Sequence, residues 1–170
     1  MYKKFIPTYF NNNIFEIDFN KVKSLGYKTL FIDLDNTLES PYINTPSDKV
    51  ISLINTLKDL NFNVIILSNN KEHRVKEYCK NLNVTYFYDV KKPYLKRISK
   101  IIKENSIDLT NALSIGDQVM TDVFLANKLD IDVILLEPLT IKDEPITFIP
   151  RLLDKHYRKI INKKNLTKEL

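Results

Sequence analysis

Five short apolar runs alternate along this chain with longer segments of helical periodicity. The runs are rich in Ile, Leu, Val and aromatic residues and are too short for stable helices, which favours strands. They occupy residues 29–34, 64–67, 84–88, 112–115 and 133–136. Helical spacing predicts helices between them, at residues 47–60, 71–82, 93–105 and 121–129, with Pro93 at a helix-opening position.

This alternation of strands and helices constrains the fold. It predicts right-handed βαβ crossovers and a parallel sheet covered on both faces. Continuous apolar runs agree, because the strands of such a sheet are buried on both sides. We therefore predict an α/β fold, a doubly wound three-layer sandwich around a five-stranded parallel sheet. Ligands of such sheets bind beyond the carboxyl ends of the strands, so the residues that follow each run are the candidate site.

The positive charge of the chain is concentrated at its C-terminal end. We divide the 170 residues into a domain at 1–150 and a tail at 151–170. The tail has seven Lys or Arg against two acids, whereas the domain has equal numbers of both signs. A neutral domain gives no reason to expect nucleic-acid binding.

The cysteine, histidine and apolar content argues against an internal disulfide, a His-rich zinc site and a membrane-spanning protein. The single Cys79 cannot form an internal disulfide, which favours a reducing compartment and a buried position in a helix. The two histidines, His73 and His156, lie far apart in the sequence, which argues against a His-rich zinc site. The apolar runs are too short to span a bilayer, and residues 1–10 lack the apolar core of a signal peptide. We expect a cytoplasmic protein.

Two carboxylates, Asp33 and Asp35, close the first apolar run in the sequence FIDLDNTL (31–38). Side chains alternate along an extended segment, so both carboxylates point to the same side. Two acids at one sheet edge repel each other unless a cation or a proton relieves them. Taken alone, the pattern is also typical of a strand that ends in an Asx turn.

Polar residues also follow the second and third runs. Ser68 can donate its hydroxyl to a phosphate while the following backbone N–H groups, beginning with that of Asn69, face the same anion. Lys92 precedes Pro93, which keeps the lysine backbone extended, so the amine can be aimed at the strand ends. The alternatives are a plain helix N-cap for Ser68 and two solvated lysines at Lys91 and Lys92.

The fourth run ends in the sequence SIGDQVMTD (114–122). Gly116 is one of only two glycines in the chain, which indicates a backbone position that no other residue fits. Asp117 then points into the cleft as a hard oxygen ligand for Mg²⁺. Asp122 opens the next helix, where an acid is also common because it complements the helix dipole.

Each of these patterns is common on its own, but chance is a poor explanation for all of them together. It would require acids, a hydroxyl, a lysine and further acids to follow four successive predicted strands. The order Asp-x-Asp, Ser, Lys-Pro and Gly-Asp-x₄-Asp resembles the four-motif signature of the haloacid-dehalogenase (HAD) superfamily over residues 29–136. The sequences DNTL, SNN and GDQ…TD resemble subfamily IIIA, and within it the YqeG family, related to the mitochondrial phosphatidylglycerophosphate phosphatases. The opening KKFIP (3–7) and Arg74-Val75 extend the likeness.

The resemblance implies a Mg²⁺-dependent phosphomonoester hydrolase that works through an aspartyl-phosphate. Asp33 is then the nucleophile, and Asp35 the general acid and base. Mg²⁺ is held by Asp33, the Asp35 carbonyl and Asp117. Asp122 steers Asp117 or a bound water rather than binding the ion. Three groups carry the charge on the phosphoryl oxygens: Ser68, the Asn69 N–H and Lys92.

A receiver domain of bacterial signalling is the nearest non-enzymatic alternative, with a similar fold, a phosphorylated Asp and Mg²⁺. Its acidic pair is adjacent on the first strand, and its phosphoacceptor lies on a later strand. Here Asp33 and Asp35 both follow the first run, two residues apart. Because a receiver also lacks a second acid placed to expel a leaving group, we favour the hydrolase.

The intervals between the motifs bear on the substrate. Residues 38–68 and 68–92 each have room for one helix and one strand, so we expect no cap domain. An open cleft suits a phosphate on something large or surface-bound, because a small metabolite would be poorly shielded from water. With the family resemblance, this favours the lipid head group of phosphatidylglycerophosphate. The alternatives are a soluble phosphomonoester, a phosphoprotein, or a binding module whose basic tail contacts RNA or a protein.

The tail predicts a basic amphipathic helix. Its apolar residues follow helical spacing: Ile149, Leu152, Leu153, Tyr157, Ile160 and Ile161. Its basic residues lie toward the other face: Arg151, Lys155, Arg158 and Lys163. Such a helix can bind an anionic membrane surface peripherally through residues 151–170, or it can dock its apolar face on the domain and leave the charges solvated.

Overall fold

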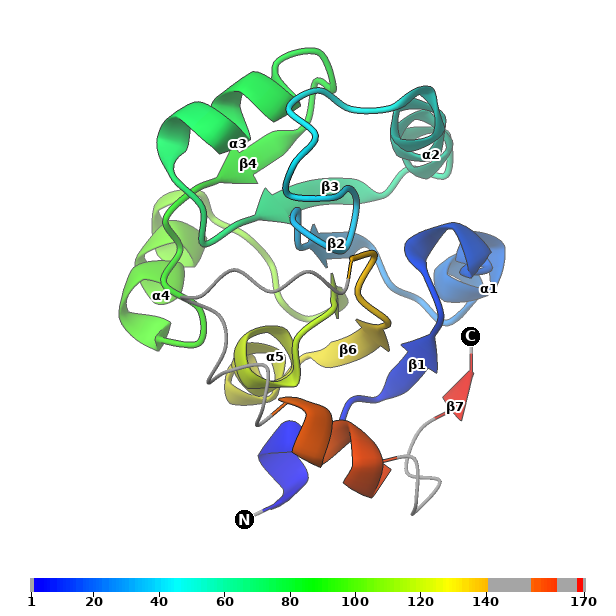
Figure 1. Cartoon of the computed structure of the whole chain (residues 1–170), viewed down its shortest axis with the longest axis vertical. Helices are drawn as coiled ribbons and strands as arrows, with labels where there is room; N and C mark the ends of the chain where they lie inside the picture. The colour runs from blue at the N-terminus through cyan, green and yellow to red at the C-terminus, as the bar shows by residue number, and fades with distance from the viewer. Residues whose placement is uncertain (1, 141–153, 162–167, 170) are drawn as a thin grey trace.

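A single parallel sheet organises the protein. The computed structural model describes residues 2–140, 154–161 and 168–169. Within these residues the sheet has seven strands in the order β4-β3-β2-β5-β6-β1-β7 (Figure 1). The strands are β1 (Tyr9–Asn11), β2 (Thr29–Ile32), β3 (Asn63–Leu67), β4 (Thr85–Phe87), β5 (Ala112–Gly116), β6 (Asp132–Leu136) and β7 (Lys168–Glu169).

The five predicted strands are confirmed as β2 to β6. All residues of β2 are buried, as expected for the middle of a parallel sheet. β2 pairs with β3 on one side and β5 on the other, with Ile32 in register with both Ile66 and Ile115. The residues that follow these three strands therefore leave the sheet at one edge, where a ligand can reach them.

Helices cover both faces of the sheet. They are α1 (Phe19–Ser24), α2 (Asp48–Asp59), α3 (Glu72–Cys79), α4 (Leu95–Glu104) and α5 (Phe124–Leu129), with short 3₁₀ turns η1 (Tyr2–Phe5) and η2 (Ile14–Glu16). Ile32 lies in one core with Ile54 of α2 and Tyr78 of α3, whereas Phe31 lies in a second core with Ile98 of α4. Neighbouring residues of one strand thus serve opposite cores, which confirms the three-layer sandwich.

The sheet extends further than the prediction. β1 adds to the edge of β6, with Tyr9 in register with Ile134, and β7 pairs with β1. Strands of three and two residues are too short to produce a periodic pattern. The helix α1 was also not expected; the Asp18 carboxylate caps it by accepting the backbone N–H groups of Asn20 and Lys21 at 3.0 and 3.1 Å.

Two helix starts differ from the prediction. Pro93 does not open α4, because Tyr94 is the extended N-cap residue and the helix begins at Leu95; the Lys92–Pro93 peptide is cis. The fourth helix starts earlier than residue 121, with a π-helical turn (Val119–Val123) that leads into α5. Both differences lie beside the sheet edge that carries the polar residues.

The intervals between the first three predicted strands contain only core elements. The residues between β2 and β3 form a loop and α2, and those between β3 and β4 form α3. Both intervals lie wholly within residues 2–140, which the structure describes, and no cap domain is present there. Cys79 is buried at the end of α3, as predicted.

The described part of the tail, residues 154–161, forms a helix that packs on the domain. Ile161 is buried in the same core as Phe31, and the ring of Tyr157 stacks on that of Phe5, 4.5 Å between centroids. Lys155 is exposed as predicted, but Arg158 is not solvated: its side chain turns toward the domain and is only 13% exposed. The predictions for residues 149–153 and 163 lie outside the described residues.

Among the helices of residues 2–140 and 154–161, none has both the length and the apolar character needed to cross a bilayer.

Candidate active site

The first two predicted acids stand at the end of β2. Leu34 between them is fully buried, whereas the side chains of Asp33 and Asp35 are 12% and 20% exposed. This is the alternation that the sequence predicts. The Asp33 backbone N–H donates to the carbonyl of Ile115 at 2.9 Å, which continues the β2–β5 pairing up to Asp33. Both acids therefore lie at the carboxyl edge of the central strand.

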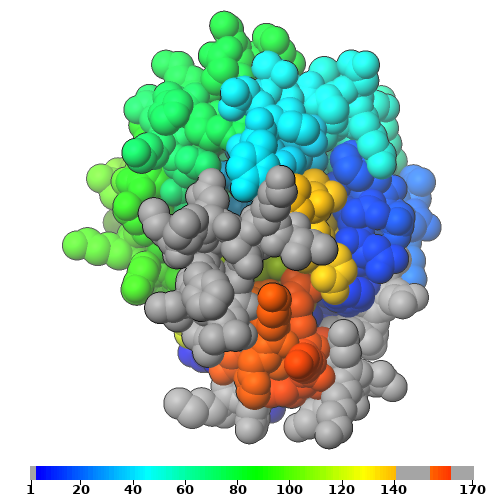
Figure 2. Space-filling view, viewed as in Figure 1, coloured from blue at the N-terminus to red at the C-terminus, as the bar shows by residue number. Residues whose placement is uncertain are grey.

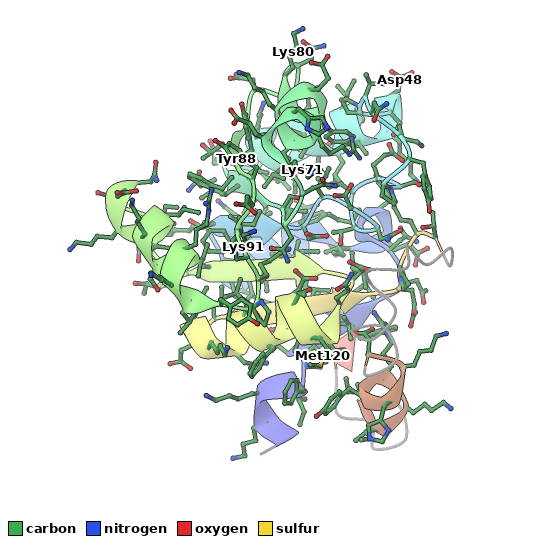
Figure 3. The ribbon with its side chains drawn as sticks, turned by 60° about the vertical axis from the view of Figure 1, so that its left-hand side comes forward. Asp48, Lys71, Lys80, Tyr88, Lys91 and Met120 are labelled. Carbon is green, nitrogen blue, oxygen red and sulfur yellow. The ribbon has the colours of Figure 1, made fainter. Side chains whose placement is uncertain are left out.

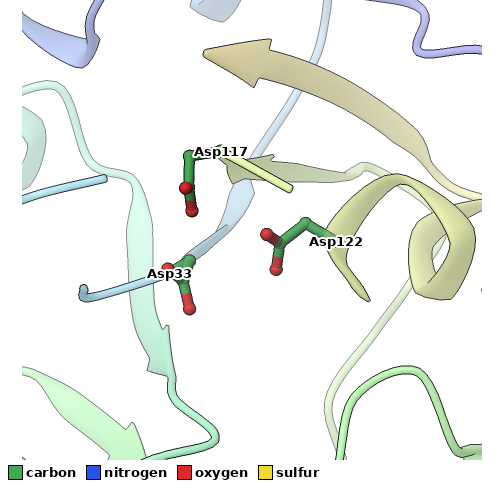
Figure 4. Close-up of side chains that lie close together, drawn as sticks. All are labelled: Asp33, Asp117 and Asp122. Atoms are coloured by element: carbon green, nitrogen blue, oxygen red, sulfur yellow. The ribbon is translucent and has the colours of Figure 1, made fainter. Parts of the chain in front are cut away.

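Three carboxylates from two loops meet at this edge. The side chains of Asp33, Asp117 and Asp122 point toward one another (Figure 4), and each offers an oxygen within 4.8 Å of the other two. Asp33 and Asp117 come together as predicted. Asp122, which we expected to stand behind Asp117, is itself a member of this carboxylate cluster. Its own orientation is fixed by the Gln118 N–H, which donates to Oδ2 at 3.1 Å.

Gly116 is required here by close packing. A Cβ atom at this position would lie 2.4 Å from Cγ and 2.6 Å from Oδ2 of Asp122. No side-chain carbon can approach that closely, so any other residue would push Asp122 out of the carboxylate cluster. The prediction that only glycine fits is consistent with this geometry, and the reason is steric contact with Asp122.

Lys92 stands inside the cluster as its counter-charge. Its Nζ donates to Asp33 Oδ1 at 2.5 Å, to Asp122 Oδ1 at 2.7 Å and to the Leu67 carbonyl at 3.1 Å, which uses all three ammonium hydrogens. The Lys92 side chain is only 4% exposed. The alternative of a solvated surface lysine is therefore excluded for Lys92, whereas Lys91 beside it is 63% exposed.

Burial and mutual repulsion make ionisation of Asp33 and Asp117 costly when no cation is bound. Burial raises the pKa of the Asp33 carboxyl to about 7, although Lys92 opposes this shift and Asp122 adds to it. Burial, followed by repulsion from Asp33 and Asp122, raises the pKa of Asp117 well above its usual range. Burial alone would lower the pKa of Lys92, but attraction to Asp122 and Asp33 raises it. One ammonium among three carboxylates leaves a site of hard oxygen donors that fits a divalent cation.

The residues after β3 organise the loop that carries Lys92. The Asn69 side chain makes a reciprocal pair with the Lys92 backbone: Nδ2 donates to the Lys92 carbonyl at 3.0 Å, and Oδ1 accepts the Lys92 N–H at 2.7 Å. Ser68 is 1% exposed, and its Oγ accepts the Asn70 N–H at 3.0 Å. The predicted phosphate-binding residues Ser68, Asn69 and Lys92 thus lie together.

Asp35 is held by two residues to which the sequence assigned no role. Asn70 Nδ2 donates to Asp35 Oδ2 at 3.1 Å, and Arg74 Nη2 donates to Oδ1 at 3.0 Å. Arg74 is 8% exposed, and its Nε and Nη1 have no hydrogen-bond partner among the described residues. The likeness at Arg74-Val75 drew attention to this residue, but no sequence pattern linked Arg74 or Asn70 to Asp35.

Comparisons with known proteins show the family of this chain. The sequence family described as mitochondrial PGP phosphatase matches residues 2–140. The protein named "Probable phosphatase YqeG" of Bacillus subtilis (strain 168) is 31% identical over 162 residues, which cover 95% of this chain and 94% of that protein.

The fold resembles those of solved structures. An uncharacterized protein from Listeria monocytogenes serotype 4b has the same fold, with a TM-score of 0.55 and 16% identity over 78% of this chain and 99% of that one. A 3-deoxy-D-manno-octulosonate 8-phosphate phosphatase from Moraxella catarrhalis, crystallised with magnesium, phosphate and KDO, gives a TM-score of 0.46 at 16% identity, over 85% of this chain and 98% of that one.

Proposed function

Because this chain belongs to the family described as mitochondrial PGP phosphatase, we propose that it hydrolyses the phosphomonoester of phosphatidylglycerophosphate. The chain is a phosphatase of the HAD type; its Mg²⁺ dependence and an aspartyl-phosphate intermediate are part of the proposal. The observation that carries it is the convergence of Asp33, Asp117 and Asp122 at the carboxyl edge of the sheet, with Lys92 paired to Asp33 and Asp122.

The reaction divides into two displacements at phosphorus. A carboxylate oxygen of Asp33 forms a bond to phosphorus while the bond from phosphorus to the alcohol oxygen breaks, and Asp35 gives its proton to that oxygen. Asp35, now ionised, then takes a proton from a water whose oxygen attacks phosphorus. The bond from phosphorus to Asp33 breaks, and inorganic phosphate leaves. The two steps require opposite protonation states of Asp35, so each prepares the next.

The positions of the other residues suit these steps. Asn70 and Arg74 fix the Asp35 carboxylate beside the sheet edge, close enough that its charge adds to the raised pKa of Asp33. Lys92, the Ser68 hydroxyl and the Asn69 N–H would bind the phosphoryl oxygens as charge builds on them. Lys92 needs only to shift from Asp33 to a phosphoryl oxygen for this, because Asp122 continues to anchor its ammonium.

Asp33, Asp117 and the Asp35 carbonyl would hold Mg²⁺, and Asp122 lies within reach of the same ion. When bound, the cation offsets the repulsion between the anionic nucleophile and the anionic phosphoryl group. Because Gly116 and the Gln118 N–H keep Asp122 in place, the carboxylates are arranged before the ion arrives.

Cation affinity should depend on pH in a direction set by the raised pKa values. Cation binding requires ionised carboxylates, and the pKa of Asp33 is raised to about 7, so protons compete with the ion below that pH. We expect Mg²⁺ to bind about tenfold more weakly at about pH 6 than at about pH 8, with more contrast if Asp117 also takes up a proton. Isothermal titration calorimetry measures this directly. Equal affinity at both pH values would contradict the proposed ligand set.

The lack of a cap domain between β2 and β4 supports a lipid head group as substrate. Only a loop and α2 separate β2 from β3, and only α3 separates β3 from β4, so no cap domain closes over Asp33 from either interval. A phosphate presented at a membrane surface can enter such a site while its acyl chains stay in the bilayer.

A basic surface begins next to the active-site lysine and supports the same substrate. A surface hollow of about 420 Å³ is lined by Lys91, Tyr94, Lys96, Arg97 and Lys100. Lys91, labelled in Figure 3, lies on the loop between β4 and α4, directly before Lys92. Tyr94 is 70% exposed. Lys91 and Arg97 pair with Asp89, and Lys100 pairs with Glu104, so these acids reduce the positive charge of the surface without cancelling it. The remaining positive charge around an exposed aromatic ring suits an anionic bilayer surface, where each unpaired Lys or Arg contributes about 1 kcal/mol.

The experiment that tests the proposed function measures phosphate release across a substrate panel with and without Mg²⁺. The panel contains phosphatidylglycerophosphate in anionic vesicles, glycerol 3-phosphate, a phosphoserine peptide, nucleotides and sugar phosphates. We expect kcat/KM for the lipid to exceed that of glycerol 3-phosphate by more than about tenfold, since each factor of ten needs only about 1.4 kcal/mol of additional binding.

The panel separates the alternatives. A higher kcat/KM on any soluble phosphomonoester, or on the peptide, would replace the lipid as substrate while leaving the reaction in place. Absence of phosphate release from every member, with the protein folded and Mg²⁺ present, would contradict the enzymatic proposal and favour a binding module.

A further inference from the structure

The C-terminal helix, residues 154–161, lies against the active-site side of the sheet. Its position is fixed by apolar contacts: Tyr157 stacks on Phe5, and Ile161 is 3% exposed in the core. In Figure 2 this helix, in orange, lies beside the gold segment that follows β6. The docking leaves the polar side of the helix facing the loop after β5, which carries Asp117.

Arg158 connects this helix to the backbone of the site. Its Nη2 donates to the carbonyl of Asp117 and, at 2.7 Å, to the carbonyl of Leu136 at the end of β6. Its Nη1 forms an ion pair with Glu137 Oε1 at 3.2 Å. The side chain is 13% exposed, so these contacts are largely shielded from water. A single guanidinium thus joins the loop after β5 to the end of β6.

Asp154, one helical turn earlier, holds the other end of the same loop. Its Oδ1 accepts the backbone N–H of Val119, and its Oδ2 accepts Arg158 Nε at 2.8 Å. The residue is 8% exposed. The loop segment 117–119 is therefore bound at its first carbonyl and at its last N–H by a pair of side chains that also bind each other.

These contacts supply hydrogen-bond partners to backbone groups that have none within the strand or the helix. Asp117 follows the last residue of β5, and Val119 is the first residue of the π-helical turn, where N–H groups lack an intrahelical acceptor. Buried backbone groups need partners, and here a carboxylate and a guanidinium supply them. Burying both ions has a desolvation cost, which their mutual pairing and these backbone contacts offset.

We propose that Asp154 and Arg158 are positioning residues that set the orientation of Asp117 and hence the affinity of the cation site. The inference rests on the proposed function only in taking Asp117 as a cation ligand. It goes beyond the family assignment, because the matched region ends at residue 140 and both side chains lie after it. Loss of a residue that orients a metal ligand lowers metal affinity about 10- to 100-fold in other sites, and we expect a change of that size.

The test compares Mg²⁺ binding by calorimetry in the full chain and in Arg158→Met, which keeps an unbranched apolar stem and removes every donor. We expect Arg158→Met to bind Mg²⁺ about tenfold more weakly or worse. Lys159→Met is the matched control, since Lys159 is an exposed neighbour on the same helix, and it should bind as the unmodified chain does. Arg158→Lys, which retains the charge but not the fork of donors, should fall between them.

Further variants separate a failure to fold from a loss of the positioning role and from a failure of the cation site. Should Arg158→Met fail to fold, Arg158→Lys and Asp154→Asn carry the measurement, because both preserve size and leave the Tyr157 and Ile161 contacts intact. Unchanged Mg²⁺ affinity in a folded Arg158→Met or Asp154→Asn would overturn the proposal. Asp117→Asn tests the premise separately: if it binds Mg²⁺ normally, the proposed cation site fails, whereas normal binding in the Arg158 variants alone removes only the positioning role.

Discussion

Replacing Asp33 with Asn is expected to lower kcat by at least about 10³-fold, because the amide cannot form the bond to phosphorus that begins the proposed reaction. The loss should be the same for every substrate that the unmodified enzyme hydrolyses. Steady-state kinetics at saturating Mg²⁺ measures it. A variant that retains more than about a tenth of the activity would show that Asp33 is not the nucleophile.

The fold of Asp33→Asn should be at least as stable as that of the parent at neutral pH. The pKa of Asp33 is raised to about 7 from 3.8, so ionisation is less favourable in the folded chain than in the unfolded one. The contribution of the Asp33 carboxyl to the free energy of unfolding is therefore complete below about pH 4 and is lost as pH rises through 7. Thermal unfolding without Mg²⁺ should show a smaller decline with pH for the variant. A lower melting temperature at about pH 8 would mean that the Lys92 contact outweighs the burial cost.

Removing Lys92 should have the largest effect on stability. Lys92→Met deletes the only cation that contacts both Asp33 and Asp122 among the described residues, and Asp122 is 4% exposed. A buried carboxylate left without its partner typically costs about 3–5 kcal/mol, and we expect that decrease in the free energy of unfolding. Loss of a donor to the phosphoryl oxygens should lower kcat by about 10²–10³-fold as well. Urea denaturation and kinetics measure the two effects.

The neighbouring lysine gives a matched control for this prediction. Lys91→Met changes the same residue type one position earlier, where the side chain is 63% exposed and its one ion pair within the described residues is with Asp89 at 2.7 Å. It should alter the free energy of unfolding by less than about 0.5 kcal/mol. The double variant Lys92→Met/Asp122→Asn should recover part of the lost stability, because the unpaired charge is gone. Equal stability of Lys91→Met and Lys92→Met would contradict the buried ion pairs.

The central sheet could be predicted because its strands are buried on both faces. Such strands leave continuous apolar runs such as the one that becomes β3, and the helices between them have clear apolar faces. β1 and β7 could not be predicted, since they have three and two residues and add to an edge of the sheet by backbone pairing. Backbone hydrogen bonds hold such short strands at the edge of the sheet, and these bonds require no particular pattern of side chains.

The candidate site could be predicted in its residues but not in its contacts. Asp33, Ser68, Lys92 and Asp117 all stand at strand ends in the sequence, and parallel strands bring their carboxyl ends to one edge. The partners of each were not predictable. That Asn69 would bind the Lys92 backbone depends on how two loops approach each other, which leaves no periodic signal.

The burial of Arg158 was not predicted, for a similar reason. Helical spacing places it opposite the apolar residues, which normally means toward solvent. The tail instead docks between η1 and the end of β6, so the polar side of the helix also meets protein. Burial of a charged residue depends on the tertiary position of the whole helix, and periodicity carries no information about it. Arg74, buried against Asp35, is a second case.

A crystal grown with Mn²⁺, an anomalous scatterer that accepts the oxygen ligands of Mg²⁺, tests most directly whether the acids share one cation. The proposed site predicts a single anomalous peak roughly 2.0–2.3 Å from a carboxylate oxygen of both Asp33 and Asp117. The carboxylates of Asp33 and Asp117 turned apart, with no peak between them at saturating Mn²⁺, would contradict the cation site and the reaction built on it.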